Sequence, residues 1–563
     1  MSDLLTLVPP WVAFLLAAAI VVLAPRRVGA AAAVVLTALT VPWVLLAPAG
    51  TSLAVAPFGF DQVLFRVDSF TRPVAALFGF VAALNVLYGY GTGEDSRQTA
   101  YSLCYMGSGV AAVLAGDWLT MLVAWELLAV TATVLVWHHG GDSVRPAFRY
   151  AVYHLVGGTL LVAAVALHYL DAGTFLYGSG VGGGLAAGLP TALAILGVGI
   201  NLGFVGLHAW LPDTYPRPHV AASVVLAGFT TKVAVYVLAR VAPDGDAIVV
   251  WLGAAMVLYG VTQAILQTDM RRLLSYHIIS QVGYMVVAVG IGTAAGLTGA
   301  FAHLTAHVLY KGLLFMVAGA IIVRTGQYSL KHLGGLGRRM PVTFVAFLVA
   351  ALAITGLPGF SGFVSKGLVT KAAESAGGEA LWWVLVLGSV GTALSFAKFG
   401  YYAFVRREPT PITVSRAPLA LSAALVVAAV PSIVFGLLPG VFLGAHPGDP
   451  GTFAPYATTE LTKALAATAA GVVGFAVLKG PLGRIHPVDV DQVLHPVGSS
   501  FARATAATAA GIGAAASRTG AATTRRLGSL VGRDPSTAES SIHAALAALA
   551  LTAAVALLLA VLA

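Results

Sequence analysis

Residues 121–130 read MLVAWELLAV, a run of apolar side chains interrupted by one charge, Glu126. A helix of about 20 apolar residues crosses the hydrocarbon core of a bilayer, and the run that begins near residue 118 predicts such a helix. Of the seven glutamates in the chain, only Glu126 lies inside an apolar run. A charge in a bilayer costs roughly 2.5 to 3.5 kcal/mol on insertion scales, so we expect Glu126 to have a partner or a function.

The whole chain has the same apolar character. Of its 563 residues, 58% are hydrophobic and only 9% are charged, against roughly 25% charged in an ordinary soluble domain. The mean hydropathy is +0.90. A single cysteine, Cys104, excludes an internal disulfide and a cysteine metal cluster. The composition excludes soluble, disordered and disulfide-framework proteins, and it predicts an all-α polytopic membrane protein.

Apolar runs of sufficient length predict about 14 to 16 transmembrane helices. They begin near positions 4, 29, 67, 99, 118, 147, 190, 219, 247, 273, 297, 341, 380, 418, 459 and 542. The first run, residues 4–23, lacks a basic leader and is followed by further spans. We therefore expect a true first helix there, not a cleaved signal.

The net charge of +9 is distributed over short loops between these runs. When loops are numbered by the helix they follow, the odd loops hold most of the basic residues: Arg26, Arg27, Arg97, Arg145, Arg149, Arg217, Arg271, Arg272, Arg324, Lys331, Arg338, Arg339, Arg406 and Arg407. The positive-inside rule then predicts a multi-pass protein of the cell membrane with odd loops in the cytoplasm and both termini outside. No basic run with interleaved aromatics occurs, so we expect no nucleic-acid partner.

Two segments differ from ordinary spans. Residues 50–66 alternate loosely and contain Pro and Gly, which predicts a short extracellular hairpin. Residues 480–541 are rich in Ala, Thr, Ser and Gly, and form either an interfacial helix or a linker. The predicted regions are N-terminal helices with the hairpin (1–95), a core (96–410), C-terminal helices (411–479), the linker or interfacial helix (480–541) and a terminal transmembrane helix (542–563).

Helix breakers fall inside two of the apolar runs. Prolines at 212, 216 and 218 end one span, and the segment GLPGFSG at 356–362 interrupts another. A proline frees a carbonyl that lipid cannot satisfy, so such breaks persist where the backbone lines a cavity. Paired breaks point to a transport site, although the first break is equally consistent with a simple loop end.

Lys232 and Lys398 are two further charges that we place at membrane depth. Lys232 is a candidate partner for Glu126, although it could instead extend its ammonium to an interface. Lys398 lies about 12 Å deeper than Arg406 and Arg407, too deep to reach the interface easily. The weaker candidates, which could simply hydrogen-bond a neighbouring helix, are His154, His208, His277 and Lys366.

His303, His307 and Lys311 follow one another at i, i+4 and i+8. Four residues advance about 400°, so the three side chains share one helix face with about 6 Å between neighbours. Three titratable groups in one column suit a proton relay. Core histidines with satisfied hydrogen bonds are the alternative. A metal site would need further ligands that the nearby sequence lacks, so we expect no metal.

Seven motifs that follow one another within about residues 60 to 410 resemble the proton-translocating antiporter-like subunits shared by Mrp cation/proton antiporters, respiratory complex I and membrane-bound hydrogenases. They are Trp125-Glu126, Leu207-His208-Ala209-Trp210-Leu211-Pro212-Asp213, Thr231-Lys232-Val233-Ala234-Val235-Tyr236, Asp269-Met270-Arg271-Arg272-Leu273-Leu274-Ser275-Tyr276, Ser280-Gln281-Val282-Gly283-Tyr284, the His303/His307/Lys311 column, and Ser361-Gly362-Phe363-Val364-Ser365-Lys366.

The resemblance implies two inverted five-helix repeats, each with a broken helix, and a chain of buried charges that carries protons. It implies that Glu126 and Lys232 form the input half of this chain and that the histidine column with Lys311 forms the connection. Lys398 is then the terminal lysine. The chain departs from the pattern at Asn201, where many members carry a lysine, and it looks most like the D-type subunits of Mrp antiporters.

This resemblance favours a proton-conducting subunit of a multisubunit Na+(cation)/H+ antiporter. Its expected partners are other membrane subunits of the same complex, protons, Na+ and the lipid bilayer. The alternatives are a proton-pumping subunit of a hydrogenase or NADH dehydrogenase, a proton-coupled inorganic-carbon uptake subunit, and a scaffold with a decayed pathway. Flavin, nicotinamide and nucleotide motifs are missing from the sequence, so we expect no cofactor and no redox chemistry in this chain.

Overall fold

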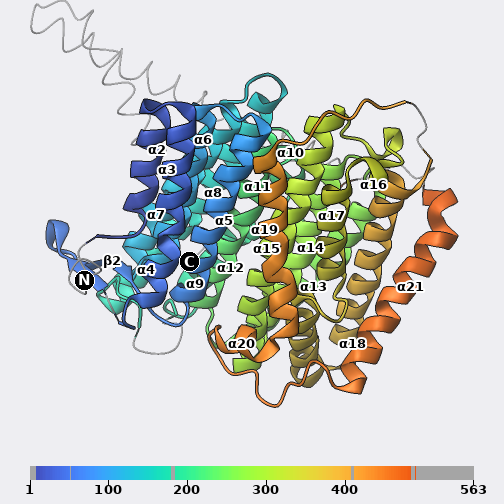
Figure 1. The fold of residues 1–563 in the computed structure, drawn as a ribbon. Helices are drawn as coiled ribbons and strands as arrows, with labels where there is room; N and C mark the ends of the chain where they lie inside the picture. Colours follow the sequence, from blue (N-terminus) through green and yellow to red (C-terminus); the bar gives the residue numbers. More distant parts are fainter. Residues whose placement is uncertain (1–7, 51, 179–183, 408–410, 483–488, 490–563) are drawn as a thin grey trace, which may run out of the picture. The chain divides into compact units, whose positions relative to one another are not determined.

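Long apolar helices packed side by side make up the described part of the protein (Figure 1). The computed structural model describes residues 8–50, 52–178, 184–407, 411–482 and 489. All of these except residue 489 belong to a first unit that ends at Pro487. The predicted terminal span, 542–563, and nearly all of the predicted linker, 480–541, lie outside the described residues.

The helices of this unit are, in chain order, α2 Val12–Leu23, α3 Arg26–Ala38, α4 Thr40–Leu46, α5 Thr71–Thr92, α6 Ser96–Leu114, α7 Trp118–Trp137, α8 Val144–Ala172, α9 Leu189–Leu202, α10 Trp210–Thr214, α11 Val220–Gly228, α12 Thr230–Val241, α13 Ala247–Leu266, α14 Met270–Gly290, α15 Ala294–Thr325, α16 Leu336–Arg339, α17 Pro341–Thr355, α18 Ser361–Gly400, α19 Leu419–Leu437, α20 Pro439–Gly444 and α21 Thr458–Leu482.

These helices confirm the prediction of an all-α polytopic membrane protein. Within the described residues, eleven helical segments are long and apolar enough to cross a membrane, and three shorter helices are apolar as well. Each predicted apolar run that falls in the described residues coincides with a helix. The reason is that a segment in lipid must satisfy its own backbone hydrogen bonds, which a helix does internally. The inverted relation between the two halves stays a prediction.

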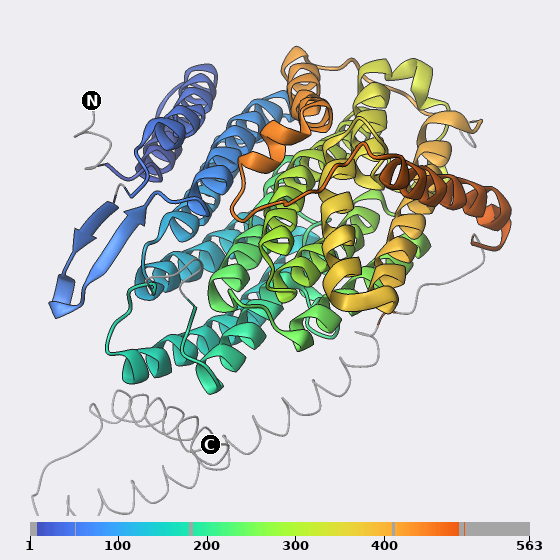
Figure 2. The same cartoon turned by 90° about the horizontal axis from the view of Figure 1, so that it is seen from below.

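A β-hairpin separates α4 from α5, as the alternation of residues 50–66 predicts. Strand β1, Ser52–Val55, pairs antiparallel with β2, Gln62–Arg66, and the register shifts between Leu53 and Ala54. The strands project away from the helices (Figure 2). Only this one two-stranded sheet occurs in the described part of the chain.

An ion pair fixes the segment that follows the hairpin. Arg240, near the end of α12, donates to Asp68 Oδ2 over 2.7 Å and is only 4% exposed. Burial alone would raise the pKa of the Asp68 carboxyl. The charge of Arg240 and hydrogen bonds from Arg240, Thr71 and Phe70 outweigh burial, and hold this pKa below its usual range. The pair therefore anchors the start of α5 to α12.

The helices are broken at four places near the middle of the chain's core region. The first predicted break is present, because Pro216 and Pro218 lie in the non-helical turn between α10 and α11. Pro212 itself lies inside α10 near its start, where a proline costs no hydrogen bond. The second predicted break, at 356–362, is confirmed between α17 and α18.

Two breaks were not predicted. Between α9 and α10, the chain leaves the helix at Gly203, which has a φ of +82°, a value that residues with a side chain rarely adopt. The other lies at Phe229, between α11 and α12.

Helix α18 consists of two arms that fold back on each other at Gly378, which has a φ of +77°. Tyr284 on α14 shows this most directly. Its hydroxyl donates to Leu385 O in the second arm, and the Lys366 ammonium of the first arm lies 5.0 Å from its ring. The turn between the arms is visible in Figure 2. Residues far apart along α18 therefore face the same helix, α14.

Candidate functional site

Five of the six predicted site residues are buried in the bundle. Lys232, His303, His307 and Lys311 have no exposed surface, and Lys398 is 7% exposed. Glu126 is half-buried. Five titratable nitrogen groups without a carboxylate among them are costly in a membrane, so their local partners decide what this site can do.

Lys232 binds the end of a broken helix. Its Nζ donates to Ala227 O over 2.7 Å and to Thr231 Oγ1 over 2.8 Å. The break at Phe229 leaves carbonyls at the end of α11 without helical donors, and the dipole of a helix is negative at that end. The Thr230 amide, freed by the same break, donates to the Tyr105 hydroxyl. Backbone carbonyls thus take the place of a carboxylate beside Lys232.

Lys366 and Lys398 bind helix ends in the same way. Lys366 Nζ donates over 2.8 Å to Ile354 O, in the last turn of α17 just before the second break. Lys398 Nζ donates over 2.6 Å to both Ile265 O and Gln267 O, at the end of α13. Lys366 was only a weak candidate from the sequence. The sequence could have identified Lys366 by its position soon after the GLPGFSG break, because such a break leaves free backbone carbonyls nearby.

The predicted column on α15 is present. The ring centroids of His303 and His307 are 6.5 Å apart, close to the spacing expected for one helix turn. His303 Nδ1 shares a hydrogen bond of 3.0 Å with Ser365 Oγ. Neither ring nitrogen of His307 has a hydrogen-bond partner in the described residues, and the same holds for the Lys311 ammonium. His307 is therefore not a core histidine with satisfied hydrogen bonds.

Further polar groups link this column to its neighbours. Tyr310 lies 3.4 Å from Gln281 on α14, and Gln281 lies 3.4 Å from Thr392 on α18. His277, another weak candidate from the sequence, is fully buried, and both of its ring nitrogens lack a partner in the described residues. It lies within electrostatic range of Lys311, Lys366 and Lys398. His277 thus occupies the space between the column and Lys398.

The column on α15 also has a charged neighbour on α12. His307 lies within electrostatic range of Lys232 as well as Lys311 and Lys366. The unpartnered nitrogens of His277, His307 and Lys311 are groups that ordered water can satisfy. Lys232, the column on α15, His277 and Lys398, here called the polar region, thus form a series in which each group lies within electrostatic range of the next.

Glu126 is not joined to this region by any direct contact. No hydrogen bond or ion pair connects its carboxylate to Lys232 or to another described residue, so the structure does not show the candidate Glu126–Lys232 pair as a direct contact. Lys232 turns instead toward the carbonyls of the broken helix. Glu126 packs against Gly158 of α8, where a Cβ atom would collide with the carboxylate, and its helix neighbours Val123 and Leu127 are exposed.

The polar residues Asn201 and His154 do not connect Glu126 to the polar region. Asn201, which is buried on α9, lies close to Gly157 of α8, and its Oδ1 has no hydrogen-bond partner among the described residues. His154 Nδ1 bonds to Tyr150 O, and the ring stacks on that tyrosine and lies edge-on to Trp210. His154 Nε2 has no hydrogen-bond partner among the described residues, and no hydrogen bond links His154 to Glu126 in this part of the chain.

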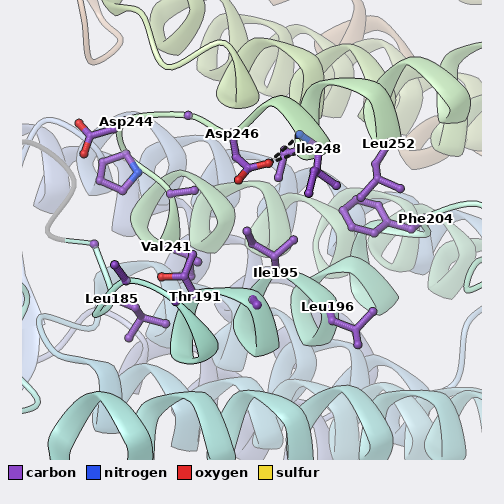
Figure 3. Close-up of a pocket in the computed structure, with 18 of the residues that line it drawn as sticks. Leu185, Thr191, Ile195, Leu196, Phe204, Val241, Asp244, Asp246, Ile248 and Leu252 are labelled. Carbon is purple, nitrogen blue, oxygen red and sulfur yellow. Dashed lines mark hydrogen bonds between the residues drawn. The ribbon is translucent and has the colours of Figure 1, made fainter. Parts of the chain in front are cut away.

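A cavity of about 960 Å³ lies apart from these charges, between α9 and the turn from α12 to α13 (Figure 3). Its lining is mainly apolar, with Asp244 and Asp246 along one edge. Asp246 accepts hydrogen bonds from the Ile248 and Val249 amides at the start of α13. None of the predicted site residues lines this cavity, so it is separate from the polar region.

Known proteins share this sequence and this fold. Residues 115–395 match the family model described as "NADH:quinone oxidoreductase/Mrp antiporter, TM". The chain is 32% identical over 383 residues to NADH-quinone oxidoreductase subunit N of Desulforudis audaxviator, covering 63% of this chain and 75% of that protein. It is 28% identical over 403 residues to the D-type subunit of the Na(+)/H(+) antiporter of Bacillus subtilis, covering 68% and 81%.

The fold agrees with a solved structure. A chain of respiratory complex I from Thermus thermophilus superposes with a TM-score of 0.66 and 25% identity, over 78% of this chain and all of that one. The matched segment, 115–395, contains all of the predicted site residues except Lys398. The chain belongs to the NADH:quinone oxidoreductase/Mrp antiporter family, and is an antiporter-like, proton-translocating, multi-pass membrane subunit of the kind found in multisubunit complexes.

Proposed function

We propose that this chain is the proton-conducting subunit of a multisubunit Na+(cation)/H+ antiporter. The observation that carries the proposal is the column on α15, where His307 and Lys311 are fully buried without a hydrogen-bond partner among the described residues. A purely structural role would not repay the cost of burying such groups. A role in moving protons explains them, because both groups can gain and lose a proton.

In this proposal, protons move by electrostatic coupling between neighbouring groups. A proton that arrives at Lys232 makes a proton on His307 less favourable, because the two groups lie within electrostatic range. A change of one pKa unit corresponds to about 1.4 kcal/mol, which is enough to move a proton one step along the column. His303, Lys311, Lys366 and His277 continue the path to Lys398. Glu126, half-buried against Gly158, makes no direct contact with the described residues of this path.

The direct test is the substitution Lys311→Gln in the complete complex, assayed as Na+-driven proton flux in membrane vesicles. We expect a loss of at least about a hundredfold, because a residue of similar size that cannot titrate interrupts the path. Lys371→Gln is the matched control, since this lysine is exposed on α18 and pairs only at the surface with Glu374. Normal flux in Lys311→Gln, with the control also normal, would contradict the proposal.

A second candidate is a proton-pumping subunit of a redox complex. The 32% identity to an NADH-quinone oxidoreductase subunit favours it, since the same buried groups would serve a pump driven by electron transfer. Purification of the native complex distinguishes the two. Small membrane subunits alone support the antiporter, whereas copurified iron–sulfur proteins support the redox pump.

A further inference from the structure

A buried carboxylate that the proposed pathway does not use lies at the arginine-rich end of the bundle. Glu94 follows α5, where Gly93 adopts a φ of +82° and turns the chain inward. Its side chain has no exposed surface. Oε2 accepts a hydrogen bond of 3.0 Å from Thr99, but Oε1 has no hydrogen-bond partner in the described residues. An unpartnered carboxylate oxygen in such a place calls for an explanation.

The nearest polar group to this oxygen is the imidazole of His219, just before α11. His219 Nδ1 lies 3.7 Å from Glu94 Oε1 and also accepts from the Ala221 amide. A carboxylate oxygen and an unprotonated ring nitrogen are both acceptors, so they have no attraction for each other until a proton arrives. One proton on either group gives the contact a donor and allows a hydrogen bond, which is charge-assisted when the proton is on His219. His219 is 22% exposed, which gives the pair access to water.

Other charged groups surround the pair on each neighbouring element. Arg26 of α3 donates to Glu94 O, Arg271 of α14 donates to Pro218 O, and Tyr88 of α5 donates to Met316 O. In the loop after α7, burial and then the charges of His219, Arg271 and His138 lower the pKa of His139. Asp95 pairs at the surface with His138 over 3.6 Å. His139 is thus neutral at physiological pH, and does not compete for the proton.

A polar stripe runs from this pair to Lys232. His219, Ser223 and Ala227 follow one another at i, i+4 and i+8 along α11, a distance of about 12 Å. Ser223 Oγ donates to Tyr215 O and lies 3.2 Å from Arg271 Nη1. Ala227 O holds the Lys232 ammonium. The fixed charge of Arg271 opposes a metal cation on this route, whereas a bound proton becomes part of a covalent bond.

We propose that Glu94 and His219 form a proton-binding pair that supplies Lys232 along this face of α11. This inference rests on the proposed function, which supplies the direction of proton transfer. A proton taken from water binds the pair. It then leaves through water and the Ser223 hydroxyl and forms an N–H bond on the neutral Lys232 amine. This route provides the titratable neighbour that Asn201 and the distant Glu126 do not provide.

Infrared pH-difference spectroscopy on the purified complex tests the pair independently of transport. We expect a buried carboxyl band in the wild type that is lost in Glu94→Gln and kept in Asp95→Asn. The control is closely matched, because Asp95 is the adjacent carboxylate on the same loop, and asparagine preserves its cap on α6. A band that survives in Glu94→Gln would overturn the pair as a proton site.

Proton flux in vesicles then tests the supply of Lys232. We expect at least about a tenfold loss in Glu94→Gln and in His219→Gln, with flux in Asp95→Asn near that of the wild type. Normal flux in both variants, beside an active wild type, would overturn the supply role and leave the proposed function intact. Absent flux in the wild type would instead overturn the proposed function together with the supply role, while the infrared band still decides whether the pair binds a proton.

Discussion

Each buried lysine of the polar region has a different local environment, and this decides what its removal does. Lys232, Lys366 and Lys398 bind backbone carbonyls, whereas Lys311 has no hydrogen-bond partner in the described residues. A lysine at a helix end both satisfies the backbone and carries a proton, so the two roles must be separated by experiment.

Lys366 offers this separation. We expect Lys366→Met to cost about 1–3 kcal/mol of stability, because Ile354 O loses its donor beside the break, and to lower proton flux at least about tenfold. Lys366→Arg keeps the donor but cannot release its proton, so we expect stability near that of the wild type with flux still low. Thermal unfolding and vesicle flux measure the two effects. Normal flux in the arginine variant would assign Lys366 a purely structural role.

The sequence could predict which residues are buried, but not which groups they contact. The burial of Lys232, His303, His307, Lys311 and Lys398 follows from charge within long apolar runs. The candidate pairing of Glu126 with Lys232 is not seen as a direct contact, because sequence spacing does not say which helices pack together. A backbone carbonyl as the partner of an ammonium leaves no sequence signal of its own. His277 and Lys366 were underrated for the same reason.

At the scale of helices, the apolar runs predicted nearly every element, and prolines and glycines predicted two of the four breaks. The break at Phe229 was missed because its segment has no proline, and a single glycine at 228 is common in transmembrane helices. This break positions the carbonyl that binds Lys232, so the least predictable feature of the backbone lies at a central residue of the site.

Two hydrogen bonds of His446 connect α20 to α15, and we call them the His446 clamp. They lead to a prediction about how stability depends on pH. His446, just after α20, donates from Nδ1 to Phe442 O and accepts from Thr305 of α15 at Nε2. Burial lowers its pKa to about 4, and the bond to Phe442 only partly opposes this. The histidine is therefore neutral when folded but binds a proton below about pH 6.5 when unfolded. Stability from this residue is complete above about pH 6.5 and is lost as the pH falls toward 4.

We expect the wild type to lose about 1–2 kcal/mol more than His446→Gln when the pH falls from 7 to 5. Glutamine can keep one hydrogen bond but does not titrate, so it removes the pH dependence without emptying the site. Denaturant unfolding of the purified complex at the two pH values measures this difference. Equal losses in both proteins would contradict the clamp.

At the scale of the whole unit, the proposed pathway places the buried groups in a single series. Lys232 is near the column on α15, the column is near His277, and His277 is near Lys398. A path in series behaves differently from independent sites, because one interruption stops all transport and a second adds nothing. This property does not depend on which cation is exchanged or on whether the complex is an antiporter or a pump.

The most direct test is proton flux through the purified complex in liposomes, with Lys232→Gln, Lys311→Gln and Lys398→Gln studied singly and in pairs. We expect that each single variant lowers proton flux to the background and that no pair lowers it further, while flux in Lys371→Gln stays normal. Partial losses that multiply in the pairs would show that the three lysines act independently, and would contradict a single proton path through the bundle.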